Sequence, residues 1–412
     1  MRGAVRAQLA RLLEAVENAP PVEALDVVAA ELVGQLGARE VTFLIADYSG
    51  HAVTRFVRVG PLVEGERRHG AERADTVPLV GTVYGQVLRT QQTDVTSKDG
   101  GARLVIPVTD RGDALGLLEL VLPAYPDDQL VTEVVTLAHA LAFIVIANRR
   151  YTDLFEWGQR SLPLSLSAEI QRRLLPASFT CEAGQLTVAG WLEPANSVGG
   201  DTFDYALDRH TLDLSITDAT GHEVDAALLA TLVVGSLRNS RRRALGIGEQ
   251  ARAANDDLAA YASRRKFVTG QLMQIDLDTA TATIVNAGHP LPLRVRDGRV
   301  KEIELAVDLP FGLQAGRQFQ VQQLPLEPGD RIALLTDGML ERNAARLDVT
   351  TALAESTCLH PRETVQALGG AVMALTRGQL RDDATVLLLD WHGGPRRLRE
   401  TNGGADRKGA SD

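Results

Sequence analysis

The segment LDLSITDATGHEVDAALLAT, residues 212–231, sets the architecture of the second half of the chain. Its first residues alternate apolar and polar side chains, which is typical of a strand with one buried face. Asp218 ends this strand, small residues follow, and an apolar helix is predicted for residues 225–239. A carboxylate cannot contribute to a hydrophobic core, so we expect Asp218 at a strand end that faces a cleft.

Three more acidic motifs lie at turns in the same half of the chain. They are Val198-Gly199-Gly200-Asp201, Thr336-Asp337-Gly338 and Arg381-Asp382-Asp383. Each motif alone is an ordinary turn or cap sequence. Together, strand-end carboxylates that converge on one cleft would repel each other unless cations neutralise them. Because Mg²⁺ and Mn²⁺ prefer oxygen ligands, the residues predict a site for hard cations, in hydrolytic enzymes a pair about 3.5–4 Å apart.

Many strands and separate helices are predicted between residues 184 and 391. The strands are 186–193, 203–207, 212–218, 267–276, 281–286, 293–296, 319–324, 331–336 and 384–389, and the helices are 225–239, 248–263 and 361–376. This pattern predicts an α+β fold in which sheets pack together and helices lie outside.

Residues 1–150 read as a separate module with helices at both ends. Helices are predicted at 9–19, 22–36, 83–89 and 130–150, and strands at 40–47, 51–59, 103–108 and 114–122. The RLVIPV and ALGLLELV strands and the terminal helix resemble a GAF domain, which implies a GAF-like α/β sensor domain. Its flanking helices suggest a homodimer.

A helical linker is predicted for residues 151–180, and a disordered, Gly-rich tail for residues 393–412. The amphipathic stretch SAEIQRRLL, residues 167–175, either passes a signal between domains or acts as an inert spacer.

Composition restricts the function further. The 412 residues carry a formal net charge of −10, which disfavours nucleic acid as a partner. The basic cluster at 238–243 lacks aromatic neighbours and is interpreted as a solvated face or a helix end.

Cys181 and Cys358 lack metal-ligand spacing and fit a reducing cytoplasm. The longest apolar run, 137–147, is too short for a membrane span, and no signal peptide is recognised, so a cytoplasmic location is expected.

The region from residue 171 to 390 resembles the SpoIIE-type branch of the PPM (type 2C-like) serine/threonine phosphatases, which includes RsbU-like regulators. The matching segments are IQRRLLP, SVGGDTFDY, LSITDATGHEVDAALLAT, FVTGQLMQID, IVNAGHPLPLRV, LPFGL, LEPGDRIALLTDGMLE and RDDATVLLL. The resemblance implies a PPM-type α-β-β-α sandwich over residues 181–392, with metals at one edge.

The resemblance also implies residue roles. Asp218 would bridge two Mn²⁺ or Mg²⁺ ions, and Asp201 with the backbone carbonyl of Ala219 would hold one of them. Asp337 and Asp382 would hold the other, with Asp383 as the fallback if the register shifts by one residue. A water activated by the two ions would attack phosphorus directly, so Asp218 and Asp201 are the catalytic carboxylates.

Two histidines are open to two interpretations. His289 either contacts substrate or shapes its own turn, and His222 has the same ambiguity. Glu223 stands where the family usually has glycine, so reduced or conditional activity is compatible with the sequence.

The predicted function is therefore a metal-dependent protein serine/threonine phosphatase in bacterial signalling, controlled by the GAF-like domain. By resemblance, its substrate is a phosphorylated anti-sigma-factor antagonist of the STAS type. A non-catalytic signalling scaffold and a small-molecule phosphohydrolase are the alternatives.

Overall fold

The computed structural model describes residues 2–48, 50–59, 75–159, 165–195, 199–221, 223–261, 266–340, 347–378, 380–394 and 398–406. The chain divides into two compact units, Met1–Pro163 with Glu400–Asp412, and Leu164–Arg399. Each unit has its own hydrophobic core.

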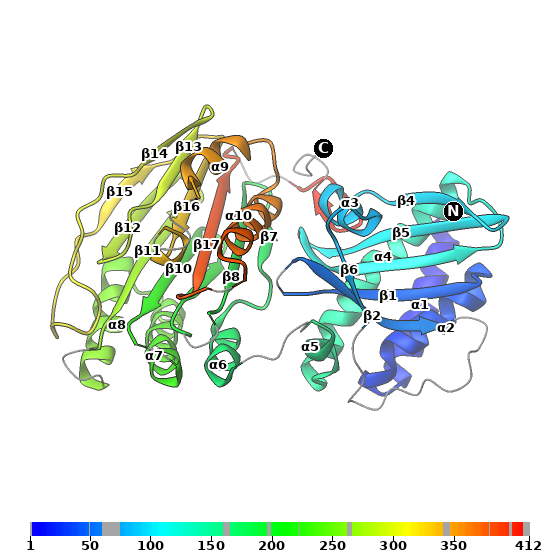
Figure 1. The fold of residues 1–412 in the computed structure, drawn as a ribbon, viewed down its shortest axis with the longest axis horizontal. Helices are drawn as coiled ribbons and strands as arrows, with labels where there is room; N and C mark the ends of the chain where they lie inside the picture. Colours follow the sequence, from blue (N-terminus) through cyan, green and yellow to red (C-terminus); the bar gives the residue numbers. More distant parts are fainter. Residues whose placement is uncertain are drawn as a thin grey trace. The chain divides into compact units, whose positions relative to one another are not determined.

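The first unit is built on an antiparallel sheet with the strand order β3-β2-β1-β6-β5-β4 (Figure 1). Its strands are β1 (Glu40–Ala46), β2 (Ala52–Val59), β3 (Asp75–Pro78), β4 (Asp94–Lys98), β5 (Gly101–Asp110) and β6 (Asp113–Leu122). One face packs against α1 (Arg2–Asn18), α2 (Ala24–Leu36), α4 (Asp128–Asn148) and the short α5 (Leu154–Gly158). The other face packs against α3 (Val83–Thr90).

The strands and helices predicted for this unit are present, and the structure adds β3 and β4. Both added strands lie at the edges of the sheet and are largely exposed, so they lack the apolar alternation by which a strand is recognised. The identification of this unit as a GAF domain stays a prediction.

One helix in the described part of the chain, Asp128–Tyr151, is long and apolar enough to cross a membrane by length and composition alone. It is longer than the apolar run predicted from sequence. Within it, Val134, Leu137 and Leu141 are buried in the core of the first unit. A core helix passes the same test, so this observation is weak support for a membrane span.

The second unit contains two antiparallel sheets (Figure 1). The first has the order β15-β12-β11-β10-β9, with β9 (Thr202–Leu207), β10 (Thr211–Ala219), β11 (Val268–Asp276), β12 (Thr281–Ala287) and β15 (Gln322–Pro325). The second has the order β14-β13-β16-β17-β8-β7, with β7 (Thr180–Glu182), β8 (Leu186–Glu193), β13 (Leu293–Arg296), β14 (Arg299–Glu302), β16 (Asp330–Leu335) and β17 (Ala384–Trp391).

The two sheets face each other across a shared core, and helices cover both outer faces. Along β17, Leu387 and Leu389 point into the core between the sheets, whereas Val386 and Leu388 pack under helices. Those helices are α9 (Val349–Glu355) and α10 (Pro361–Thr376), while α7 (Glu223–Arg242) and α8 (Ile247–Tyr261) cover the other sheet. The predicted α-β-β-α sandwich is confirmed.

The structure contains a helix within the predicted helical linker and differs from the predicted disordered tail. The helix α6 (Leu166–Leu174) packs on α7 within the second unit, because it buries Ser167, Ala168 and Gln171. Residues 401–406 form a small hairpin around Gly403 and Gly404, both with positive φ, rather than a disordered segment. Ala405 is 3% exposed, and the N–H of Gly112 donates to the carbonyl of Gly404. Residues 395–397 and 407–412 of the predicted tail lie outside the described residues.

A buried arginine joins the outer helices to the second sheet. Arg331 on β16 donates from Nε and Nη2 to the carboxylate of Asp390, at 2.7 and 2.8 Å. The same guanidinium donates to the carbonyls of Ser356 and Leu359 and to Oγ1 of Thr364. Its hydrogen bonds therefore fix the connection between α9 and α10.

We expect Arg331→Leu to lower the free energy of unfolding of the second unit by about 3 kcal/mol, because Asp390 and two carbonyls lose their donor. Denaturant unfolding of the full chain measures the change. Arg299→Ala, on the exposed end of β14, is the control and is expected to change it by less than about 0.5 kcal/mol. A loss below about 1 kcal/mol in Arg331→Leu would contradict this assignment.

Candidate active site

Two glycines bring Asp201 close to its neighbours. A Cβ on Gly200 would lie 2.5 Å from the carbonyl oxygen of Ala219, and one on Gly199 would lie 2.7 Å from Cβ of Ser167. Neither position accommodates a side chain, so glycine is required by the close approach of three segments. Asp201 follows directly and precedes β9.

The carboxylate of Asp201 connects both sheets. It is 2% exposed, and its Oδ2 accepts hydrogen bonds from Oγ1 of Thr336 at 2.7 Å and from Oγ1 of Thr385 at 2.6 Å. Thr336 directly precedes Asp337, and Thr385 directly follows the Asp382-Asp383-Ala384 turn. The acidic motifs that the sequence separates by more than a hundred residues therefore meet at one place.

Asp218 lies beside Asp201 because β9 and β10 are antiparallel neighbours. Thr217 pairs with Thr202 in that register, so the residues just beyond this pair are adjacent. Burial raises the pKa of Asp218 to about 7, together with the charges of nearby carboxylates, and a hydrogen bond with Asp201 opposes the shift. Those carboxylates belong to Asp337, Asp382 and Asp383.

The pKa of Asp201 is also raised well above its ordinary value. Burial is the largest cause, followed by the charges of Asp218 and Asp383, and the hydroxyls of Thr385 and Thr336 oppose the shift. Both carboxylates are thus held in a region that disfavours further negative charge.

The structure separates the roles of the two adjacent residues Asp382 and Asp383. Asp383 is 1% exposed, and its Oδ1 accepts from the N–H of Ala195 at 2.8 Å. Its Oδ2 accepts from the N–H groups of Gly200 and Asp201 at 3.0 and 3.2 Å, and from a glutamine on α6. Because both of its oxygens accept hydrogen bonds from protein N–H groups, the carboxylate of Asp383 holds the neighbouring backbone in place. This arrangement favours Asp382, which is half-buried, over the fallback Asp383 as the ligand.

The donor set suits hard cations. Within the described residues, no group of three or more His, Cys, Asp or Glu side chains has the arrangement of a metal site. The side chains brought together by the four motifs nevertheless offer only oxygen donors, and their charges raise each other's pKa. Binding of Mg²⁺ or Mn²⁺ would reduce the electrostatic repulsion between buried carboxylates that lie this close together. Ala219, the predicted backbone ligand, ends β10 beside them.

His289 is a buried, neutral residue in the structure. It is 3% exposed, and burial lowers its pKa to about 3. Its Nδ1 lies 2.9 Å from Oγ1 of Thr269, and its backbone exchanges two hydrogen bonds with the side chain of Asn286. These contacts describe a histidine that shapes its own loop, and its contact with substrate stays a prediction.

Glu223 begins α7 with a φ of 56°, a left-handed conformation that costs about 1–2 kcal/mol for a residue with a Cβ. The residue that replaces the usual glycine therefore places backbone strain five positions after Asp218 in the chain. His222 lies outside the described residues.

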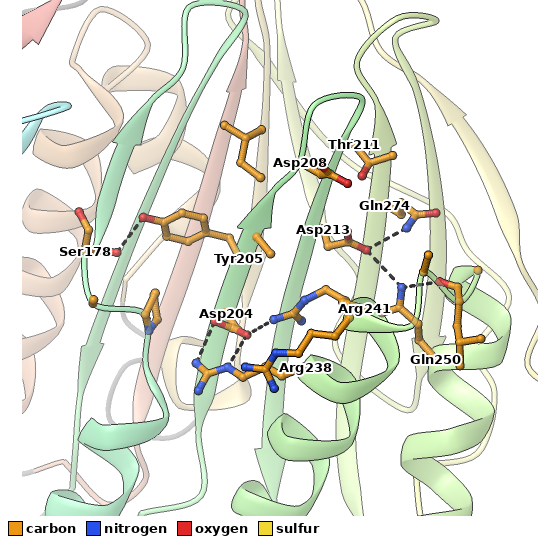
Figure 2. Close-up of a pocket in the computed structure, with 18 residues that line it drawn as sticks. Ser178, Asp204, Tyr205, Asp208, Thr211, Asp213, Arg238, Arg241, Gln250 and Gln274 are labelled. Carbon is orange, nitrogen blue, oxygen red and sulfur yellow. Dashed lines mark hydrogen bonds and ion pairs between the residues drawn. The ribbon is translucent and has the colours of Figure 1, made fainter.

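Of the two interpretations of the basic cluster, the helix end is the one that the structure bears out, because Arg241 and Arg242 lie in the last turn of α7. Arg238 and Arg241 do not form a solvated face but converge on the buried carboxylate of Asp204, as Figure 2 shows. Nearby, the side-chain amides of Gln250 and Gln274 donate to Asp213. These groups line a cavity of about 800 Å³ toward the opposite end of β9 and β10 from Asp201. The spacing of arginines along the helix indicates a charged face, but it does not indicate that Asp204 on β9 is the partner of that face.

Sequence reasoning missed several residues that support the carboxylates. Thr336 and Thr385 lie within the recognised motifs, so their position beside an acidic residue was a usable signal. The α6 glutamine, Gln171, lies in the IQRRLLP segment, where nothing in the residue pattern indicated a polar contact.

Comparison with known proteins agrees with this geometry. Residues 208–392 match the family described as Stage II sporulation protein E (SpoIIE). The chain is 22% identical over 237 residues to phosphoserine phosphatase RsbU of Bacillus subtilis, covering 55% of this chain and 69% of that protein. It is 24% identical over 187 residues to phosphoserine phosphatase RsbP of the same organism, covering 44% of this chain and less than half, 46%, of that protein.

Two solved structures are also similar. The RsbU and RsbW domains of a Mycobacterium tuberculosis protein align at 24% identity with a TM-score of 0.45, over 54% of this chain and 63% of that one. The PP2C phosphatase domain of SpoIIE from Bacillus subtilis aligns at 20% identity with a TM-score of 0.44, over 49% and 63%. The family match falls within the second unit and spans three of its four acidic motifs. Over residues 208–392, the second unit is therefore similar to the SpoIIE family, and the relatives RsbU and RsbP are phosphoserine phosphatases.

Proposed function

We propose that this chain is a protein serine/threonine phosphatase that depends on two Mn²⁺ or Mg²⁺ ions. The observation that carries the proposal is the meeting of four acidic motifs, in which neighbouring carboxylates and burial raise the pKa of both Asp201 and Asp218. The named relatives, which are phosphoserine phosphatases, support the same reaction class.

Each carboxylate has a role in this proposal. Asp218 bridges the two ions, Asp201 and the carbonyl of Ala219 hold one, and Asp337 and Asp382 hold the other. When bound, such ions neutralise charge on a phosphoryl group and make water a better nucleophile. Thr336 and Thr385 fix Oδ2 of Asp201, and the side chain of Asp201 also interacts with that of Asp218.

The substrate is a phosphoprotein, and we place it among STAS-type anti-sigma-factor antagonists. The RsbU relative and the resemblance of the motifs to the SpoIIE-type phosphatases support this choice of substrate. In the same proposal, the GAF-like first unit regulates the phosphatase, the chain forms a homodimer, and it works in the cytoplasm. A small-molecule phosphohydrolase would use the same carboxylates, so the choice of substrate has to be tested directly.

We expect Asp218→Asn to lower kcat/KM at least about 100-fold, because the bridging carboxylate is lost. Phosphate release from a phosphorylated STAS-type protein and from p-nitrophenyl phosphate, each with Mn²⁺, measures the effect. Asp213→Asn is a matched control on the same strand, where the carboxylate accepts hydrogen bonds from the side-chain amides of Gln250 and Gln274. Activity that survives Asp218→Asn would refute the site, and activity only on the aryl phosphate would refute the protein substrate.

Without metal, the raised pKa values predict a pH-dependent instability. Asp201 and Asp218 keep protons in the folded state at pH values where the unfolded chain has released them, so they lower stability as pH rises from about 4 through 7. The buried histidines His289 and His360 have lowered pKa values and act in the opposite sense.

Comparing wild type with Asp218→Asn cancels the histidine contribution. In metal-free protein, we expect the variant to have the higher Tm, with a difference that grows from about pH 4 to about pH 7 and then levels off. Excess Mn²⁺ should remove the advantage, because the cation takes the place of the proton in wild type. A difference that shrinks as pH rises would mean that Asp218 is not destabilised by neighbouring charge.

A further inference from the structure

Gln171, on the buried face of α6, reaches the centre of the carboxylate cluster. Its side chain is 1% exposed, and Nε2 donates to Oδ2 of Asp383 at 2.6 Å and to the backbone carbonyl of Asp201 at 2.8 Å. It therefore contacts both the supporting carboxylate and the main chain of a predicted metal ligand, without itself being an acidic residue.

These two contacts complete a clamp around one short segment of backbone. Asp383 accepts the N–H groups of Gly200 and Asp201, while Gln171 binds the carbonyl of Asp201. Both sides of the Asp201 peptide backbone are thus held by side chains from α6 and from the residue before β17. Because a carboxylate follows its backbone, a shift of this segment would move the carboxylate of Asp201.

The helix that carries Gln171 is anchored to the same unit at two further points. Cβ of Ser167 occupies the space in which a side chain at position 199 would lie. At the other end of α6, Nη2 of Arg238 donates to the carbonyl of Leu174 at 2.6 Å. Arg238 is itself held by Asp204, as Figure 2 shows, and Asp204 lies on the strand that starts after Asp201.

A buried glutamine at position 171 is energetically unfavourable if its only role is packing. Its Oε1 is buried and accepts no hydrogen bond from any residue that the structure describes. An unsatisfied buried acceptor costs about 1–3 kcal/mol, which an apolar side chain of the same size would avoid. The donor on Nε2 is the part of the amide that offsets this cost, and both of its acceptors belong to the carboxylate cluster.

We propose that Gln171 is a positioning residue that sets the affinity of the site for its cations by holding Asp383 and the backbone of Asp201. The inference rests on the proposed two-metal function. Gln171 does not touch the substrate, so its removal acts on metal binding before it acts on the chemical step. Hydrogen-bonding partners of metal-ligating carboxylates typically change metal affinity 10- to 100-fold when they are replaced.

The test is isothermal titration of the metal-free full-length chain with Mn²⁺ alone. We expect Gln171→Met, which keeps the volume and removes both donors, to raise the Kd for Mn²⁺ about 10-fold or more. Gln171→Asn keeps an amide but is too short to reach both acceptors, so it should weaken binding in the same direction. The kcat at saturating Mn²⁺ should stay within about threefold of wild type, because the ligands themselves are unchanged.

Arg173→Ala is the matched control, since Arg173 lies on the same helix with its side chain 60% exposed. It should bind Mn²⁺ with the wild-type Kd. In a cycle with Asp383→Asn, the effects of Gln171→Met should be clearly less than additive, because both act on one hydrogen bond.

Three results would overturn the proposal. An unchanged Kd in Gln171→Met and Gln171→Asn, with only a lower Tm, would assign Gln171 to packing. Full additivity with Asp383→Asn would mean that Gln171 does not act through that carboxylate. In both cases the proposed phosphatase function survives, whereas a wild-type chain that does not bind Mn²⁺ would remove the function and this inference together.

Discussion

The second unit depends on one electrostatic constraint, the confinement of like-charged carboxylates at a buried place. Antiparallel pairing places Asp201 beside Asp218, and burial together with the charges of neighbouring carboxylates raises the pKa of both. Such an arrangement lowers the stability of the metal-free fold. It persists because neutral donors hold the carboxylates in place, with Thr336 and Thr385 on Asp201. These hydrogen bonds fix the position of the Asp201 carboxylate before any cation binds.

The sandwich supplies the rigidity that this constraint requires. Two motifs come from β9 and β10 in one sheet, and two come from the ends of β16 and β17 in the other. The hydroxyls of the second sheet bind Asp201 of the first, so the packing of the sheets fixes the distances within the site. Helices cover both outer faces, and both faces of the central strands are therefore apolar. A change in the packing of the core between the two sheets would therefore change the distances between the carboxylates.

The layers and the acidic cluster could be predicted because they leave local signatures. Alternating strands, turn residues and strand-end Asp residues such as Asp218 are all visible within short windows of sequence. Contacts such as Gln171 with Asp383 join residues 212 positions apart and follow no periodicity. The pairing of Arg238 with Asp204 was missed for the same reason, since charge spacing on a helix does not reveal its partner. The hairpin at Gly403 was missed because its glycines resembled those of a flexible tail.

Asp382 and Asp383 are adjacent in the sequence but differ in their burial and in their contacts. Asp382 lies in a bend, and Asp383 lies between this bend and the first residue of β17. Asp383 turns into the protein and receives four N–H donors, while its neighbour Asp382 is only half-buried and contributes charge at Asp218. Exchanging their roles would require the whole of β17 to slip by one residue, which would move Leu387 and Leu389 out of the core between the sheets. The hydrophobic register of β17 thus decides which of two neighbouring carboxylates is buried against Gly200 and Asp201.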